Sequence, residues 1–123
     1  MSDESGPDTG FSMQKGFEHF RQGRFGAAIV HFNHFKNVQP VTKEIAKTSA
    51  IALHMSGRIA RDYYKELELS LRDLDEARKL AVGLGDQQLT AEIVDDLEKT
   101  TTLLAKRKKT ATPPDTKPRR RKI

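Results

Sequence analysis

The sequence predicts an all-α protein, with four to five helices arranged as antiparallel hairpins and disordered residues at both termini. Apolar residues return at helical spacing through residues 11–105, and no stretch of this region alternates apolar and polar residues between hairpin turns. Most of the prolines lie near the ends of the chain. A length of 123 residues leaves room for one domain with tails, because globular domains most often have about 100–150 residues.

The first part of the chain divides into a leader and a helical hairpin. Residues 1–10 contain no apolar residue after Met1, so they cannot offset the entropy lost on folding and are expected to be a disordered leader. Two helices are predicted over about 11–22 and 25–38. Gly23 lies between them, where a left-handed residue can end one helix, and Pro40 should close the second helix.

The second part of the chain begins with Thr42, a candidate N-cap, and then keeps one apolar stripe as far as Leu84. A helix of about 40 residues is too long for an ordinary domain, so a turn is expected within this stretch. Ser56-Gly57 and the capping-box pattern at Ser70 are both candidates, and a single helix over 58–83 is a third alternative. The glycines of 83–86 predict a stop before a last helix, which should fray near 106–109.

Residues 9–42 resemble one tetratricopeptide repeat. In that pattern small residues lie where two helices cross, aromatic rings fill the space between them, and a proline leads into the next repeat. The matching positions, which the resemblance implies are the repeat-packing residues, are Gly16, Gly23, Phe25, Ala28, Phe32 and Pro40. Phe35 departs from the pattern, which usually has alanine there. The resemblance implies a module that binds other proteins.

The continuation of the repeat is degenerate and can be placed in two ways. A 34-residue register sets Ala60 and Tyr64 on the small and aromatic positions, but Gly57 then stands where an aromatic residue is expected. Alternatively, residues 77–86 end a longer variant repeat, and a capping helix follows. Both placements give stacked hairpins up to about residue 105.

The positive charge of the chain belongs to its C-terminal tail. Residues 106–123 have a net charge of +8, whereas the rest of the chain has a net charge of −3. The tail also has three prolines and no aromatic residue, so it is expected to be disordered. Its basic residues form two clusters: Lys106, Arg107, Lys108 and Lys109, then Arg119, Arg120, Arg121 and Lys122.

Two basic clusters joined by a proline-containing spacer resemble a bipartite nuclear localisation signal. The alternative is a basic tail that contacts RNA or DNA through its phosphates, in a salt-dependent way and without regard to sequence. An import receptor and a nucleic acid are therefore both candidate partners of the tail. The two roles are compatible with each other.

Three further groups of residues resemble functional sites, and each has a simpler structural explanation. His19, His31 and His34 could reach one metal ion but lack the cysteine or carboxylate that usually completes a zinc site. The acidic residues Glu92, Asp95, Asp96 and Glu98 are interpreted as a solvated helix face. Tyr63 and Tyr64 alternate with cations as in a stacking surface for nucleic acid, but adjacent helical residues point about 100° apart, so one tyrosine is expected in the core.

These patterns predict a non-catalytic adaptor that binds a protein partner through its helical body and uses its tail as a nuclear signal or a nucleic-acid contact. The alternative is a small RNA- or DNA-binding protein, of viral type, with a dimeric body. No catalytic motif, metal site or cofactor site is expected. Without cysteine, a basic signal peptide or a long apolar run, the chain is expected in the cytoplasm or the nucleus, with no membrane span. A partner or a second copy in a homodimer could cover its exposed apolar stripe.

Overall fold

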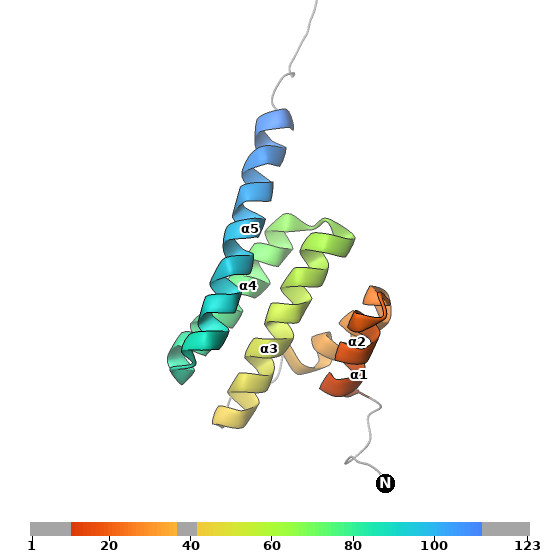
Figure 1. The fold of residues 1–123 in the computed structure, drawn as a ribbon, viewed down its shortest axis with the longest axis vertical. Coiled ribbons are helices and arrows are strands. Elements are labelled where there is room, and N and C mark those ends of the chain that lie inside the picture. The colour runs from red at the N-terminus through yellow and green to blue at the C-terminus, as the bar shows by residue number, and fades with distance from the viewer. Residues whose placement is uncertain (1–10, 37–41, 112–123) are drawn as a thin grey trace, which may run out of the picture.

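The computed structural model describes residues 11–36 and 42–111, and within these two ranges it contains helices and no strand, which confirms the predicted all-α class. Figure 1 shows the helices arranged side by side, with the last one reaching beyond the others. The helices are α1 (Met13–Arg21), α2 (Phe25–Lys36), α3 (Lys43–Ile59), the π-helix η1 (Ala60–Tyr64), α4 (Leu67–Leu84) and α5 (Gln87–Ala111).

The helices pack in chain order around α3. α1 packs on α2, α2 on α3, α3 on α4, and α4 on α5. One apolar core joins α1 and α2 to one side of α3 through Ala28, Phe32 and Met55, and a second joins α4 and α5 to its other side through Leu74 and Ile93. Because α3 contributes to both cores, it fixes the first two helices relative to the last two.

The first hairpin has the predicted turn. The Ser12 hydroxyl caps α1 by accepting a hydrogen bond from the Lys15 backbone amide at 3.2 Å. Gly23 has a φ of +78°, which glycine adopts without steric cost, and it separates α1 from α2. The second helix is described as far as Lys36, and the predicted helix end near 38 and break at Pro40 both lie outside the described residues.

The turn within the long apolar stripe lies at neither of the two predicted positions. The helix that begins after Thr42 continues through the π-helix to Tyr64, and the chain then reverses at Lys65 and Glu66. The backbone amides of both residues donate to the carbonyl of Ala60. The alternative of one helix over 58–83 is therefore also wrong, because this turn interrupts it.

Gly57 lies inside α3, where its lack of a side chain allows α4 to approach closely. A Cβ atom at this position would lie 2.7 Å from Leu74 Cγ and 3.3 Å from the Ser70 carbonyl oxygen. In a 34-residue repeat the turn at Gly23 would recur at Gly57. The turn between α3 and α4 comes later, at Lys65, so this hairpin is longer than a 34-residue period allows. The end predicted near 83–86 is confirmed: Gly85, with a φ of +72°, caps α4, and the Asp86 carboxylate accepts from the Leu89 amide at the start of α5.

The last helix is longer than the sequence predicted. It continues to Ala111, so residues 106–111 of the predicted disordered tail are helical. Cations in the final turns are favoured by the partial negative charge at the C-terminal end of a helix. Residues 112–123 of the predicted tail, like the predicted leader at 1–10, lie outside the described residues.

We expect Gly57→Ala to destabilise the protein although alanine favours helix. The new methyl group would overlap the buried Leu74 side chain, and overpacking of this kind costs about 1–3 kcal/mol, more than the roughly 1 kcal/mol that alanine gains in helix propensity. Gly83→Ala is the matched control, because Gly83 is helical and its Cβ would meet nothing within 4 Å. Thermal unfolding should show a lower midpoint for the first variant and an unchanged or higher one for the second. Equal midpoints would contradict the close packing of α3 on α4.

Candidate interaction surfaces

A buried polar network links α3 and η1 to the last two helices. The Asp96 carboxylate accepts hydrogen bonds from His54 Nε2 at 2.6 Å and from Arg61 Nη1 at 2.8 Å. Arg61 Nη1 also lies 3.5 Å from the Thr100 hydroxyl, which shares a hydrogen bond with the Ser70 hydroxyl. All five residues are less than 8% exposed. The network therefore holds α5 in register against α3, η1 and α4.

The charges of this network are compensated within it. Burial alone would raise the pKa of Asp96, but the hydrogen bonds from His54 and Arg61 outweigh burial and lower the pKa to about 2. Arg61 binds both carboxylate oxygens of Asp62 as well, and this hydrogen bonding raises the pKa of the guanidinium. The same contact lowers the pKa of the Asp62 carboxyl. Both carboxylates and the guanidinium are thus charged at neutral pH.

A second polar cluster fastens α2 to the second hairpin. Lys36 Nζ donates to Asp73 Oδ2 at 3.0 Å and to the Ser56 hydroxyl at 3.1 Å, and that hydroxyl donates to Asp73 at 2.8 Å. The Ser49 hydroxyl donates to the Lys36 carbonyl oxygen. The capping-box pattern at Ser70 would need the Asp73 carboxylate at the start of a helix, but this carboxylate is buried between helices instead.

Both clusters bridge packed helices, which is a structural role. The sequence did not reveal them, because the pairs lie far apart along the chain. The prediction of a solvated acidic face is wrong for Asp96, which is 7% exposed. Its neighbour Asp95 does lie on the surface, paired with Lys99, and Glu92 and Glu98 are exposed as expected.

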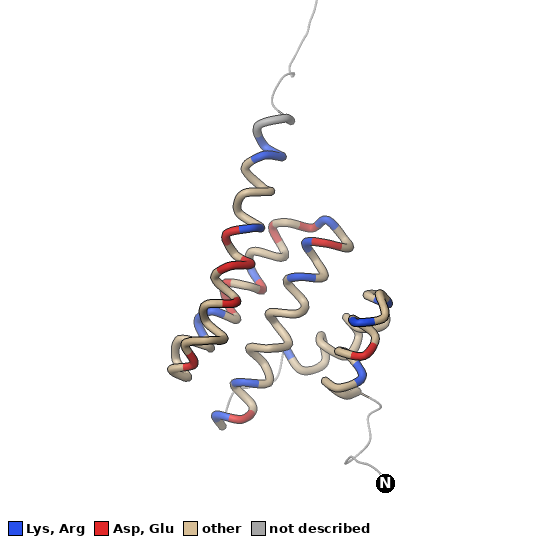
Figure 2. The backbone as a smooth tube through the Cα atoms, in the orientation of Figure 1, with Lys and Arg blue, Asp and Glu red and all other residues tan. Residues whose placement is uncertain are grey.

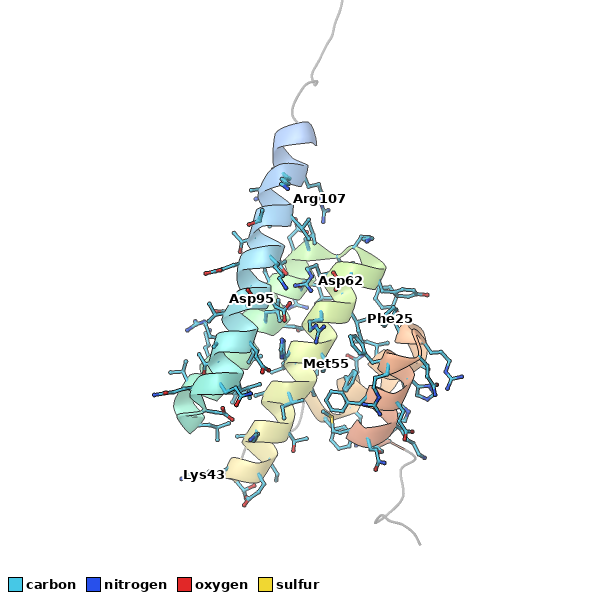
Figure 3. All side chains as sticks on the ribbon, in the orientation of Figure 1. Phe25, Lys43, Met55, Asp62, Asp95 and Arg107 are labelled. Carbon is cyan, nitrogen blue, oxygen red and sulfur yellow. The ribbon has the colours of Figure 1, made fainter. Side chains whose placement is uncertain are left out.

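An exposed aromatic surface runs from α2 to η1. We call Phe25, Tyr63 and Tyr64 the aromatic shelf. The ring centroids of Phe25 and Tyr63 are 5.4 Å apart, and those of the two tyrosines are 4.8 Å apart. The expectation that one tyrosine lies in the core is wrong, because they are 52% and 44% exposed. Figure 3 shows Phe25 at the start of α2. Of the two cations nearest to the tyrosines in the sequence, Arg61 is buried and Lys65 is exposed.

The three histidines of the first hairpin take part in ring packing. His19 and His31 stack with ring centroids 5.6 Å apart, and His34 stacks on Phe11 at 4.6 Å. His31 Nδ1 also accepts from the Ser12 amide, and burial lowers the pKa of His31. Among the described residues no group of three histidine, cysteine or acidic side chains is placed to hold a metal ion.

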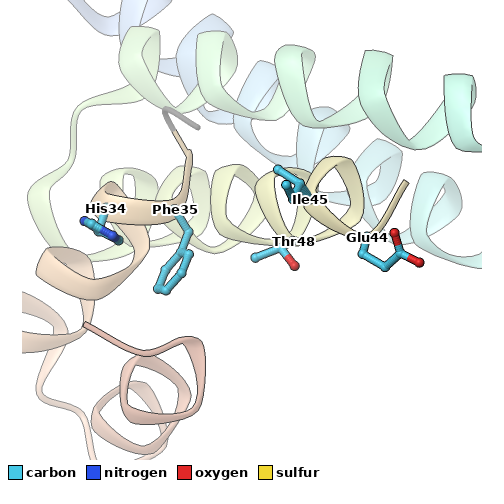
Figure 4. Close-up of a pocket in the computed structure, with 5 residues that line it drawn as sticks. All are labelled: His34, Phe35, Glu44, Ile45 and Thr48. Atoms are coloured by element: carbon cyan, nitrogen blue, oxygen red, sulfur yellow. The ribbon is translucent and has the colours of Figure 1, made fainter. Parts of the chain in front are cut away.

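A mainly apolar hollow of about 270 Å³ lies between the end of α2 and the start of α3. Figure 4 shows its lining residues, which are His34, Phe35, Glu44, Ile45 and Thr48. Phe35, the residue that departs from the repeat pattern, is half-buried and packs on the first core. The hollow carries one carboxylate and one imidazole, which come from different helices.

The first basic cluster lies on the projecting end of α5. Lys106, Arg107 and Lys108 are exposed there, and Figure 2 shows lysine and arginine colouring on the part of α5 that reaches beyond the other helices. Arg107 Nη2 donates to the Lys65 carbonyl oxygen at 3.2 Å, so the cluster is tied to the turn before α4. Lys109 is helical, and the second cluster, Arg119 to Lys122, lies outside the described residues.

The residues assigned to repeat packing lie mostly in the first core. Ala28 and Phe32 are completely buried, and Phe25 is half-buried. A Cβ atom on Gly16 would lie 2.9 Å from the Phe32 ring, so glycine is required there by the close approach of α1 to α2.

Comparisons with protein-family models, with curated proteins and with solved structures found no match to this chain. None of the helices within the described ranges combines the length and the apolar character that crossing a membrane requires.

We expect Asp96→Asn to destabilise the protein and to weaken its response to acid. Removing one partner of a buried ion pair costs about 3–5 kcal/mol. Because the folded-state pKa of Asp96 lies below its unfolded value, the wild type gains stability above about pH 4 and loses about 2 kcal/mol of it as the pH falls towards 2. Urea unfolding at several pH values should show this loss to be smaller in the variant.

The control for this prediction is Asp95→Asn, which removes the same charge from the next residue. Asp95 forms an exposed pair with Lys99, and exposed pairs contribute about 0–1 kcal/mol. If both variants changed stability and its pH dependence equally, the Asp96 network would not anchor α5.

Proposed function

We propose that the protein is a non-catalytic adaptor of tetratricopeptide-like design, which binds a protein partner through its helical body. In this interpretation α1 with α2 and α3 with α4 are two hairpin repeats, and α5 is a capping helix. The second repeat is a longer variant, as its late turn requires. The basic residues of 106–123 then serve as a bipartite nuclear localisation signal or as a nucleic-acid contact.

The observation that supports this proposal best is the aromatic shelf, which lies on a set of helices that pack on one another in chain order. Two exposed tyrosines lie beside Phe25, and tyrosine is enriched where proteins bind one another. Their ring-to-ring packing holds both side chains in place, so little conformational entropy is lost when a partner binds. The buried polar groups already bind one another, which supports a structural rather than a catalytic use of them.

A second candidate function is nucleic-acid binding by the body and the tail together. The exposure of both tyrosines favours it, because bases can stack on such rings, and Lys65 lies directly after them. The burial of Arg61 weighs against it, since this cation is occupied by two carboxylates. Protein binding is therefore the primary proposal.

We expect the full chain to capture a protein partner. The double variant that combines Tyr63→Ala with Tyr64→Ala should no longer capture it. Val82→Ala is the matched control, because Val82 is an apolar residue on α4 with similar exposure, 55%. Capture is measured from nuclease-treated and untreated extracts at several salt concentrations. The adaptor function is supported if the partner is still captured after nuclease treatment and is not captured by the tyrosine variant. Loss on nuclease treatment, with a steep dependence on salt, supports the nucleic-acid alternative instead.

Nuclear entry tests the role of the basic clusters. Replacing Lys106 and Arg107 with alanine keeps the helix propensity of α5 and leaves seven cations in the tail. For a bipartite signal we expect nuclear accumulation of a fluorescent fusion to fall sharply, and two lysines inserted in the spacer should not restore it. Restoration by those lysines would show that only the number of cations matters.

A further inference from the structure

Two stacked histidines lie at the contact that holds α1 on the rest of the protein. His19 belongs to α1 and His31 to α2, and their ring planes differ by only 17°. Phe11 meets the His31 ring edge-on, with centroids 5.9 Å apart. Because α1 packs mainly on α2, a change in the charge of these rings acts directly on the attachment of α1.

Both rings use Nδ1 as a hydrogen-bond acceptor. His31 Nδ1 accepts from the Ser12 backbone amide at 3.1 Å, and His19 Nδ1 accepts from Arg24 Nε at 3.1 Å. A ring nitrogen that accepts a hydrogen bond carries no proton, so these contacts fit neutral imidazoles with the proton on Nε2. In a protonated imidazole both nitrogens are donors, so protonation of His31 would remove the bond from Ser12 at the start of α1.

The charges around the two rings oppose protonation as well. The groups on α1 that face His31 are Lys15 and His19, whereas α3 meets α2 through apolar side chains. On α2 itself, His34 stacks on Phe11 and Lys36 is paired with an aspartate of α4. Residues 11–36 hold one acid, the exposed Glu18, and four cations, which are Lys15, Arg21, Arg24 and Lys36. A proton on either ring therefore adds to an excess of positive charge.

Burial and these neighbours change the affinity of His31 for a proton in the same direction. Burial, followed by the charges of His19 and Lys15, lowers the pKa of His31 below its ordinary value of 6.5. The unfolded chain therefore binds this proton more readily than the folded protein does. His31 supports the fold fully above about pH 6.5, and this support is lost as the pH falls from 6.5 towards the lower folded-state pKa.

The position of α1 matters for the aromatic shelf. Phe20 on α1 packs on Phe25 with ring centroids 5.3 Å apart, and Phe25 packs in turn on Tyr63. Phe25 is thus held between a ring of α1 and a ring of η1. If α1 loosens from α2, Phe25 loses one of these two supports.

We propose that His31 is a pH-sensitive link between α1 and α2, which keeps the aromatic shelf in place at neutral pH and loosens it in mild acid. Protonation removes the hydrogen bond from Ser12 and sets a positive charge against Lys15 and His19. This inference rests on the proposed adaptor function, because it adds regulation by pH to the surface that binds the partner.

The test is an NMR titration of the isotope-labelled full chain between pH 7.5 and 5. At pH 7.5 the ring nitrogens of His31 should show Nδ1 without a proton, and the pKa of His31 should lie below 6.5. The Ser12 amide signal should move with the same midpoint as His31, and the signals of Phe25 and Tyr63 should follow. A proton on Nδ1 at pH 7.5, a pKa of 6.5 or above, or a Ser12 amide that ignores the titration would overturn the link. Unresponsive Phe25 and Tyr63 signals would overturn its effect on the shelf.

A pair of variants measures what the link contributes to stability. His31→Asn offers an amide oxygen to the Ser12 amide but does not titrate, so its thermal midpoint should fall less than that of the wild type between pH 7.5 and 5. His34→Asn is the matched control, because it removes a histidine from the next turn of α2 and leaves the Ser12 bond in place. It should keep the loss seen in the wild type, and equal losses in all three proteins would overturn the proposal. If His31→Asn did not fold, the titration of the wild type would still decide.

These measurements need no partner, so their outcome is distinct from the test of the adaptor. A partner captured through the tyrosines equally well at pH 7.5 and 5.5, with a Ser12 amide that does not respond to pH, would keep the proposed function and remove only this inference. A titrating link without any tyrosine-dependent partner would remove the adaptor function instead.

Discussion

The position of α5 depends on the buried carboxylate of Asp96. This single group receives hydrogen bonds from His54 on α3 and Arg61 on η1, and Arg61 in turn reaches Thr100 one turn further along α5. The apolar contacts of Leu74 and Ile93 bring α4, α5 and α3 together, but apolar contacts alone allow several registers. Buried charges must be paired, so the network penalises any register in which Asp96 has no partner.

The π-helix is what brings Arg61 to this network. It adds a widened turn directly after α3 and leaves Lys65 in a left-handed conformation before α4 begins. π-helical turns are rare and often mark functional positions. In this chain the π-helix supplies an internal anchor, Arg61, and two exposed rings, Tyr63 and Tyr64, and the turn at Lys65 that follows it leads into α4. Structural and surface roles thus alternate within five residues of sequence.

The fold class, the first turn and the end of α4 could be predicted because short-range signals determine them. Gly23 and Gly85 both have positive φ and lie where the apolar stripes end. The turn at Lys65 was missed because lysine there does not favour it, while Gly57 misled because close packing against Leu74, rather than a turn, requires glycine at that position. Asp96 could not be distinguished from its acidic neighbours, since its partner His54 lies 42 residues earlier in the chain.

The two anchors of α5 determine how the first basic cluster is presented. Asp96 holds the middle of the helix, and the bond from Arg107 to the Lys65 carbonyl holds it eleven residues later. At 1.5 Å per residue these points are about 16 Å apart along the axis, so the intervening three turns cannot rotate independently of the body. The helix backbone that carries Lys106, Arg107 and Lys108 therefore has a defined position relative to the turn before α4. A ligand that needs this geometry would distinguish the cluster from equal charge on an unstructured chain, whereas a purely electrostatic ligand would not.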